Sequence, residues 1–91
     1  MAATVFIVVK EYFAEIHQHS IKARILSQMN DDNTFIFQLS HYYKRTSELE
    51  AKVPSSHFTS FSNAERHLLQ YLDEMQNTLD LGGAVEAAMA F

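Results

Sequence analysis

Three side chains in the N-terminal third of the chain have a spacing that suits a metal site. Glu11, Glu15 and His19 follow one another at intervals of four residues, which would place them along one side of a helix. Carboxylate and imidazole groups could bind zinc, manganese or iron there, with help from another helix. No Glu-x-x-His pair accompanies them, and a solvated acidic edge is the favoured explanation. They are weak metal candidates, and we expect no metal or other cofactor.

Other motifs of catalysis are missing from the sequence. It contains no cysteine, no Gly-rich phosphate loop and no Gly-x-Ser-x-Gly nucleophile turn. Seven Lys and Arg against eleven Asp and Glu give a net charge of −4, whereas a nucleic-acid-binding surface must be densely cationic. An enzyme is therefore the less favoured class, and we expect no nucleic-acid partner.

The expected function is protein–protein interaction. Catalysis leaves motifs in a sequence and interaction surfaces often do not, so a chain of this kind suits a small adaptor, regulator, chaperone or inhibitor that presents apolar helix faces. The alternative is a small helical metal-binding or enzymatic bundle that uses Glu11, Glu15 and His19.

The elements that would position these residues are predicted to be helices. Two Gly and one Pro in 91 residues favour long elements. Turn-forming residues at 30–34 and Pro54 divide the chain into three segments, and in each of them apolar residues recur at alternating spacings of four and three. The sequence thus predicts an all-α three-helix bundle, a single domain over residues 1–91. Its helices cover about 3–29, 34–53 and 63–81.

Two boundaries in this scheme stay open. Residues 4–9 are rich in Val and could form a short strand, although the helical pattern continues in register to Leu26. The third helix is expected to begin with a capping box formed by Ser62 and Glu65, with Ser60 as the other possible start. Gly82 and Gly83 would end it, and the tail 84–91 could add a short C-terminal helix.

The predicted N-terminal helix is apolar on two sides, and its second stripe is the expected contact surface. Helices two and three could cover both stripes, or the second could meet a partner. A core of this size is thin and has no disulfide, so we expect a homodimer or a heterologous protein partner. A single aromatic among polar neighbours is a further candidate anchor. The partner-binding candidates are Ile7, Ala14, Ile21, Ile25 and Phe37.

The apolar run at residues 4–9 does not indicate a membrane segment. Lys10 and Glu11 close it far short of the 20 or so residues that span a bilayer. It also lacks the basic region and small-residue cleavage site of a secretory signal. We expect no membrane span and a cytoplasmic location.

Overall fold

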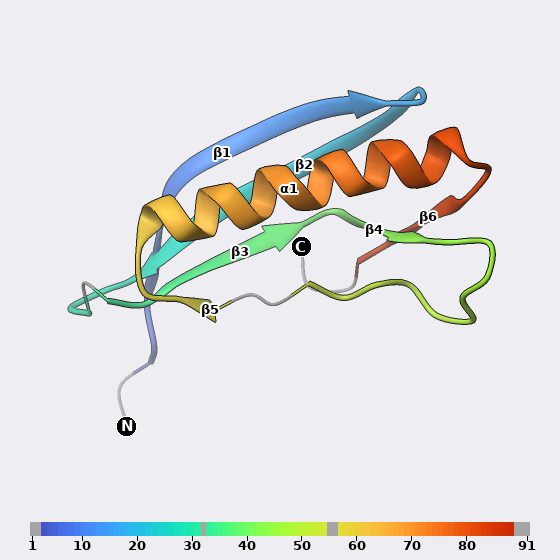
Figure 1. Ribbon diagram of the computed structural model, residues 1–91. Helices are drawn as coiled ribbons and strands as arrows, with labels where there is room; N and C mark the ends of the chain where they lie inside the picture. Colours follow the sequence, from blue (N-terminus) through green and yellow to red (C-terminus); the bar gives the residue numbers. More distant parts are fainter. Residues whose placement is uncertain (1–2, 32, 55–56, 89–91) are drawn as a thin grey trace.

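The computed structural model describes residues 3–31, 33–54 and 57–88, and it is mostly β-structure with one helix (Figure 1). The predicted all-α three-helix bundle is therefore wrong, and one of its three helices remains. The elements, in chain order, are β1 (Phe6–Ile16), β2 (His19–Gln28), β3 (Phe35–Leu39), β4 (His41–Lys44), β5 (His57–Phe58), α1 (Phe61–Asp80) and β6 (Ala84–Ala87).

The strands form two antiparallel sheets joined at Ser40. The larger sheet has the order β1-β2-β3-β5, and the smaller one pairs β4 with β6. The Ser40 amide donates to the carbonyl of Lys22 at 2.8 Å, and the Ser40 carbonyl accepts from the amide of Ala88 at 2.9 Å. Figure 1 shows α1 lying along the sheets, with the chain returning through β6 beside β4. β1 and β5 are thus the edges of the larger sheet.

The segment predicted as a helix over 3–29 is the β1–β2 hairpin. In β2 the buried side chains of Ile21, Ala23 and Ile25 alternate with more exposed neighbours, which is the period of a strand. His17 and Gln18 make the two-residue turn with positive φ angles of 49° and 68°, as a type I′ hairpin turn requires. Asn-Gly is the usual signal for that turn, and its absence hid the hairpin from sequence reasoning.

The segment predicted as a helix over 34–53 contains β3, β4 and an irregular loop. Aromatic and β-branched residues dominate both strands and favour extended backbone. Phe37, expected to be exposed, is buried and stacks on Phe58 with ring centroids 5.5 Å apart. The apparent helical spacing arose because an interval of four residues, as between Phe35 and Leu39 or between Leu39 and Tyr43, fits the two-residue alternation of a strand as well as a helix.

The helix predicted over 63–81 is confirmed as α1, which begins two residues earlier and ends one residue earlier. Its buried face consists of residues from the predicted apolar stripe, together with Thr78. Gly82 follows the helix with a φ of +90°, so its predicted role in ending the helix is confirmed. The expected helical tail is wrong, because Ala84–Ala87 pairs with β4 as β6. Residues 89–91 lie outside the described residues.

The core lies between α1 and the sheets. Leu68 and Met75 of α1 are fully buried, as are Ile25 of β2 and Tyr43 of β4. No helix in the described part of the chain combines the length and hydropathy needed to cross a membrane.

The start of α1 yields a stability prediction. The N-cap is Ser60 and not Ser62, and the Ser60 hydroxyl accepts a hydrogen bond from the Asn63 amide at 3.2 Å. Changing Ser60 to Ala removes this acceptor and should lower the free energy of unfolding by about 0.5–2 kcal/mol in urea titrations. Ser62→Ala, at the second residue of the helix, is the matched control. It should change the free energy of unfolding by less than about 0.5 kcal/mol. A larger loss for Ser62→Ala would contradict this assignment.

Candidate interaction surface

The three metal candidates do not converge. In the β1–β2 ladder Glu11 lies opposite Arg24, Glu15 opposite Ser20, and His19 opposite Ile16. Because successive side chains of a strand alternate between faces, Glu15 and His19 lie on opposite faces of the sheet. Glu11 and Glu15 share a face but lie about 13 Å apart along the strand. Among the described residues no group of three potential ligands comes together.

Most of the predicted partner-binding residues are in the interior. Ile21, Ile25 and Phe37 are at most 4% exposed and belong to the core. Ala14 is partly buried and packs against that core. Ile7 alone of the five is well exposed, at 52%. The stripe expected to form a dimer contact is therefore divided between the core and one end of β1.

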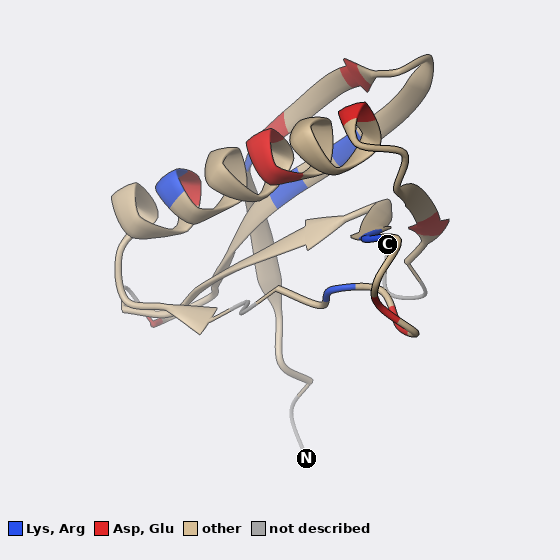
Figure 2. Ribbon diagram, turned by 45° about the vertical axis from the view of Figure 1, so that its right-hand side comes forward, with Lys and Arg blue, Asp and Glu red and all other residues tan. Residues whose placement is uncertain are grey.

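The exposed end of β1 forms a continuous apolar surface. Residues 5–9, which we call the edge segment, are Val-Phe-Ile-Val-Val, and their side chains are between 39% and 52% exposed. The segment carries no charge (Figure 2). β2 pairs with β1 on one side, and no strand among the described residues pairs on the other. Both the apolar side chains and one edge of the backbone are thus open.

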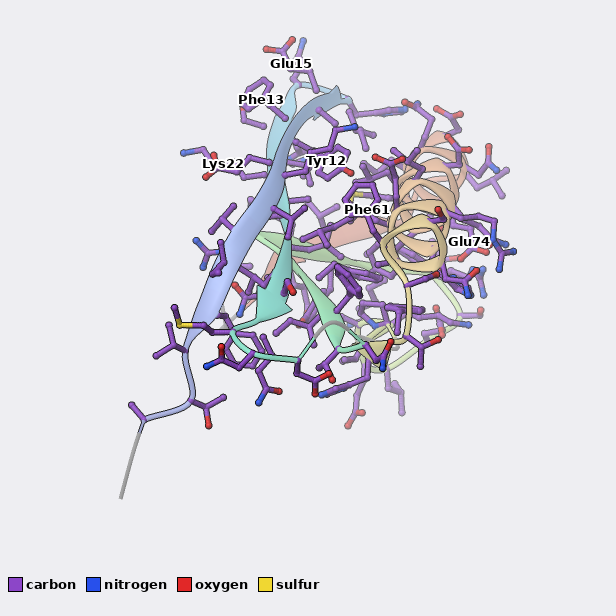
Figure 3. All side chains as sticks on the ribbon, turned by 90° about the vertical axis from the view of Figure 1, so that its left-hand side faces the viewer. Tyr12, Phe13, Glu15, Lys22, Phe61 and Glu74 are labelled. Atoms are coloured by element: carbon purple, nitrogen blue, oxygen red, sulfur yellow. The ribbon has the colours of Figure 1, made fainter. Side chains whose placement is uncertain are left out.

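A β-bulge separates the edge segment from the rest of β1. The register shifts between Val8 and Lys10, which leaves Val9 as the extra residue. Beyond the bulge the strand is attached to α1, because the Lys10 ammonium lies 2.9 Å from the Glu65 carboxylate and the Tyr12 hydroxyl donates to the same group. Figure 3 shows Tyr12 pointing toward the helix and Phe13 pointing away from it. The contacts with Glu65 therefore begin where the edge segment ends.

The backbone of the edge segment has a defined polarity. The amide of Met29 donates to the carbonyl of Val5 at 2.7 Å, so Val5 points its hydrogen-bonding groups toward β2. In an antiparallel pair this orientation alternates along the strand. Ile7, opposite Ser27, therefore also faces β2, whereas Phe6 and Val8 turn their N–H and C=O groups outward.

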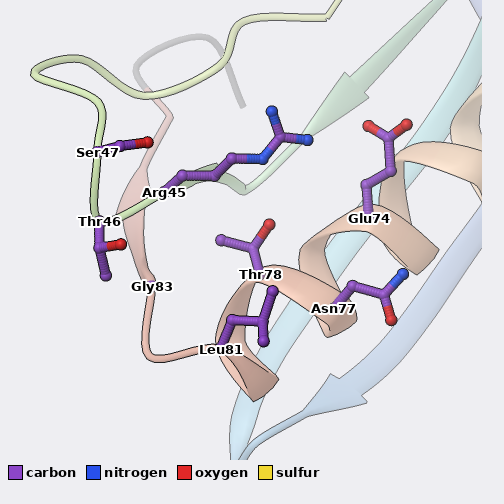
Figure 4. A pocket seen from close by; sticks show the side chains of 8 residues that line it. All are labelled: Arg45, Thr46, Ser47, Glu74, Asn77, Thr78, Leu81 and Gly83. Atoms are coloured by element: carbon purple, nitrogen blue, oxygen red, sulfur yellow. The ribbon is translucent and has the colours of Figure 1, made fainter.

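A concave site is formed by the loop after β4 and the end of α1 (Figure 4). It is a cavity of about 320 Å³. The Arg45 guanidinium lies 5.6 Å from the ring centre of Tyr43, whose hydroxyl donates to Glu74 at 2.6 Å. Burial, together with this hydrogen bond, raises the pKa of Tyr43 to about 12. Every buried side-chain polar atom among the described residues has a partner, so no unpaired group there points to a ligand. The lining residues are Arg45, Thr46, Ser47, Glu74, Asn77, Thr78, Leu81 and Gly83.

Sequence reasoning selected Ile7 but missed its neighbours in the edge segment. A spacing of four residues, as between Val5 and Val9, fits a helix as well as a strand. An uninterrupted run of Val, Phe and Ile is the signal that could have identified the strand. Such a run places apolar side chains on both faces of the strand. A strand that is covered on only one face needs apolar side chains on that face alone.

The comparisons with known proteins show no similarity: no family model, no curated protein and no solved structure matches this chain.

The contact with Glu65 predicts a pH dependence of stability. Hydrogen bonds from Tyr12 and then from Lys10 lower the pKa of the Glu65 carboxyl. A lowered pKa in the folded state stabilises the protein above the ordinary value of about 4.3, and this contribution is lost as the pH falls through the lowered value. Glu65→Gln should thus unfold at a lower temperature than the wild type at pH 7, with the difference shrinking below about pH 4.

The matched control for Glu65→Gln is Asp73→Asn, at an exposed position of the same helix. It should shift the melting temperature less than Glu65→Gln at pH 7. Equal shifts for the two variants, or a Glu65→Gln difference that persists unchanged at pH 3, would contradict the role of Glu65 in holding β1.

Proposed function

We propose that this chain is a protein–protein interaction module that binds a partner strand along the open edge of β1. The observation that carries the proposal is the edge segment, in which apolar side chains and outward-facing backbone groups occur together. Strand addition uses both, because main-chain hydrogen bonds supply affinity and alternate side chains supply specificity.

The lack of charged residues in the exposed edge segment supports this role. Proteins usually protect edge strands with charged residues, Pro or a covering element, since an open apolar edge promotes association. Here the first charge of β1 is Lys10, and the bulge also lies at that end. Soluble proteins seldom leave large contiguous apolar patches in water unless another molecule binds there.

The proposal differs from presentation of a helix face, because the apolar face of α1 is buried in the core. It retains the expected class of partner, which is a second copy of this chain or another protein. It also retains a cytoplasmic location, which imaging of a fluorescently tagged chain in its source cells would test.

A proline substitution tests this function. Because the Val8 amide faces away from β2, Val8→Pro removes no hydrogen bond of the β1–β2 ladder, yet it removes a donor needed by an added strand. The experiment mixes the tagged chain with an untagged copy of itself and with an extract of its source cells. The tagged wild type should retain a bound protein, and the tagged Val8→Pro variant should not. Mass spectrometry would identify what is retained, and circular dichroism would confirm the fold.

Leu69→Lys is the matched control, since Leu69 is 46% exposed on α1 and is not part of the edge segment. This variant should capture the same proteins as the wild type. Unchanged capture by Val8→Pro, or loss only with Leu69→Lys, would contradict binding at β1.

A further inference from the structure

We infer that the partner strand is β1 of a second copy, paired antiparallel about a two-fold axis that passes beside Ile7. This inference rests on the proposed function and names its partner. It follows from three features of the edge segment: the direction of its backbone groups, the symmetry of its side chains and the position of the bulge.

The backbone groups restrict the possible registers. Phe6 and Val8 face outward, so an added antiparallel strand must place its own outward-facing residues opposite them. With the axis at Ile7, Phe6 lies opposite Val8 of the second copy, and Val8 lies opposite Phe6 of that copy. Each pair exchanges two hydrogen bonds, and Ile7 meets its own copy in a close pair without hydrogen bonds.

Side-chain chemistry selects this register among the symmetric ones. An axis at Ile7 places all five apolar residues of one edge segment opposite those of the other, because Val5 then meets Val9. An axis at Val8 would place Phe6 opposite Lys10 and the bulge inside the paired region. An axis at Phe6 would leave Val9 opposite Ala3. Among these three registers, only the one centred on Ile7 pairs every residue of the edge segment with another residue of the edge segment, and it keeps the bulge at the end of the paired region.

The apolar surface also continues from β1 into the neighbouring strands. On the face away from α1, Val8 lies opposite Leu26, which in turn lies opposite Ile36. Pairing in the Ile7 register would extend this row by one apolar residue, because Phe6 of the second copy then lies opposite Val8. Apolar cross-strand contacts of this kind stabilise a sheet.

The opposite edge of the sheet explains why pairing would stop at two copies. β5 has only two residues, His57–Phe58, which is too short to template another strand. A contact that uses the same segment of both copies is closed by its two-fold axis. Because that axis is perpendicular to the sheet, both helices lie on one face. A contact of five residues is small beside stable interfaces of about 1,200–2,000 Å², so we expect a weak, concentration-dependent dimer.

Cysteine trapping tests the register, because the chain has no cysteine of its own. Ile7→Cys places two thiols across the axis in a pair whose Cα atoms are about 4.5 Å apart, within the range of a disulfide. Phe13→Cys is the control: it lies on the same strand and is more exposed, at 61%. Its distance from its own copy would be about 40 Å. Mild oxidation should cross-link Ile7→Cys at least tenfold faster than Phe13→Cys, as read on non-reducing gels.

A mixture of Val5→Cys and Val9→Cys chains provides the second measurement. In this register the two different chains cross-link to each other in preference to themselves, which mass spectrometry resolves. Adding Val8→Pro to Ile7→Cys should abolish the cross-link while circular dichroism remains unchanged. Equal cross-linking of Ile7→Cys and Phe13→Cys would show random collision and overturn the inference, as would no cross-link at all.

These outcomes separate the inference from the proposed function. If Ile7→Cys does not cross-link but Val8→Pro still abolishes capture of another protein, the edge binds a heterologous strand and the second-copy inference is wrong. If Val8→Pro also leaves capture unchanged, the proposed function fails with it.

Discussion

The packing of one helix face against one sheet face is the constraint on which the rest of the structure depends. Leu68, Tyr71 and Met75 of α1 are buried against a surface that includes Ile25 and Tyr43. The rings of Tyr43 and Tyr71 lie 4.7 Å apart between centroids. This single contact layer is the main hydrophobic core of a 91-residue chain without a disulfide.

The buried polar groups in that layer are satisfied locally. The Tyr71 hydroxyl donates to the carbonyl of Lys52 at 2.6 Å and accepts from the amide of Tyr43 at 3.2 Å. Burial raises the pKa of Tyr71, so the phenol stays protonated and can donate. Because Lys52 lies in the loop after β4, one side chain of α1 holds both a strand and an irregular segment in place.

α1 does not cover the whole length of β1, and the edge segment is left open. The half of β1 after the bulge is held by Glu65 and, at the hairpin turn, by a hydrogen bond between the His17 imidazole and the Asp80 carboxylate. The half before the bulge has β2 as its only neighbouring strand among the described residues. The proposed function and the proposed dimer both follow from this unequal coverage.

Sequence reasoning identified the parts of the fold whose signals are local. α1 combines an amphipathic stripe with the terminating Gly82 and could be predicted to within two residues. The β1–β2 hairpin could not, because its turn has no Gly and its apolar spacing also fits a helix seam. The metal candidates depended on that helix, and they separated once Glu15 and His19 fell on opposite faces. Ile7 was predicted to lie on the surface of a helix, and it does lie on the surface, although in a strand, because it belongs to the edge segment.

The most direct measurement is amide hydrogen exchange along β1 at two protein concentrations. When the protein is dilute, the amide of Ile7, which faces β2, should exchange slowly, while those of Phe6 and Val8 exchange rapidly. At high concentration, the amides of Phe6 and Val8 should become protected as the second strand pairs with them. Strong protection of Phe6 and Val8 in dilute solution, or rapid exchange at both concentrations, would contradict an open edge that a second copy completes.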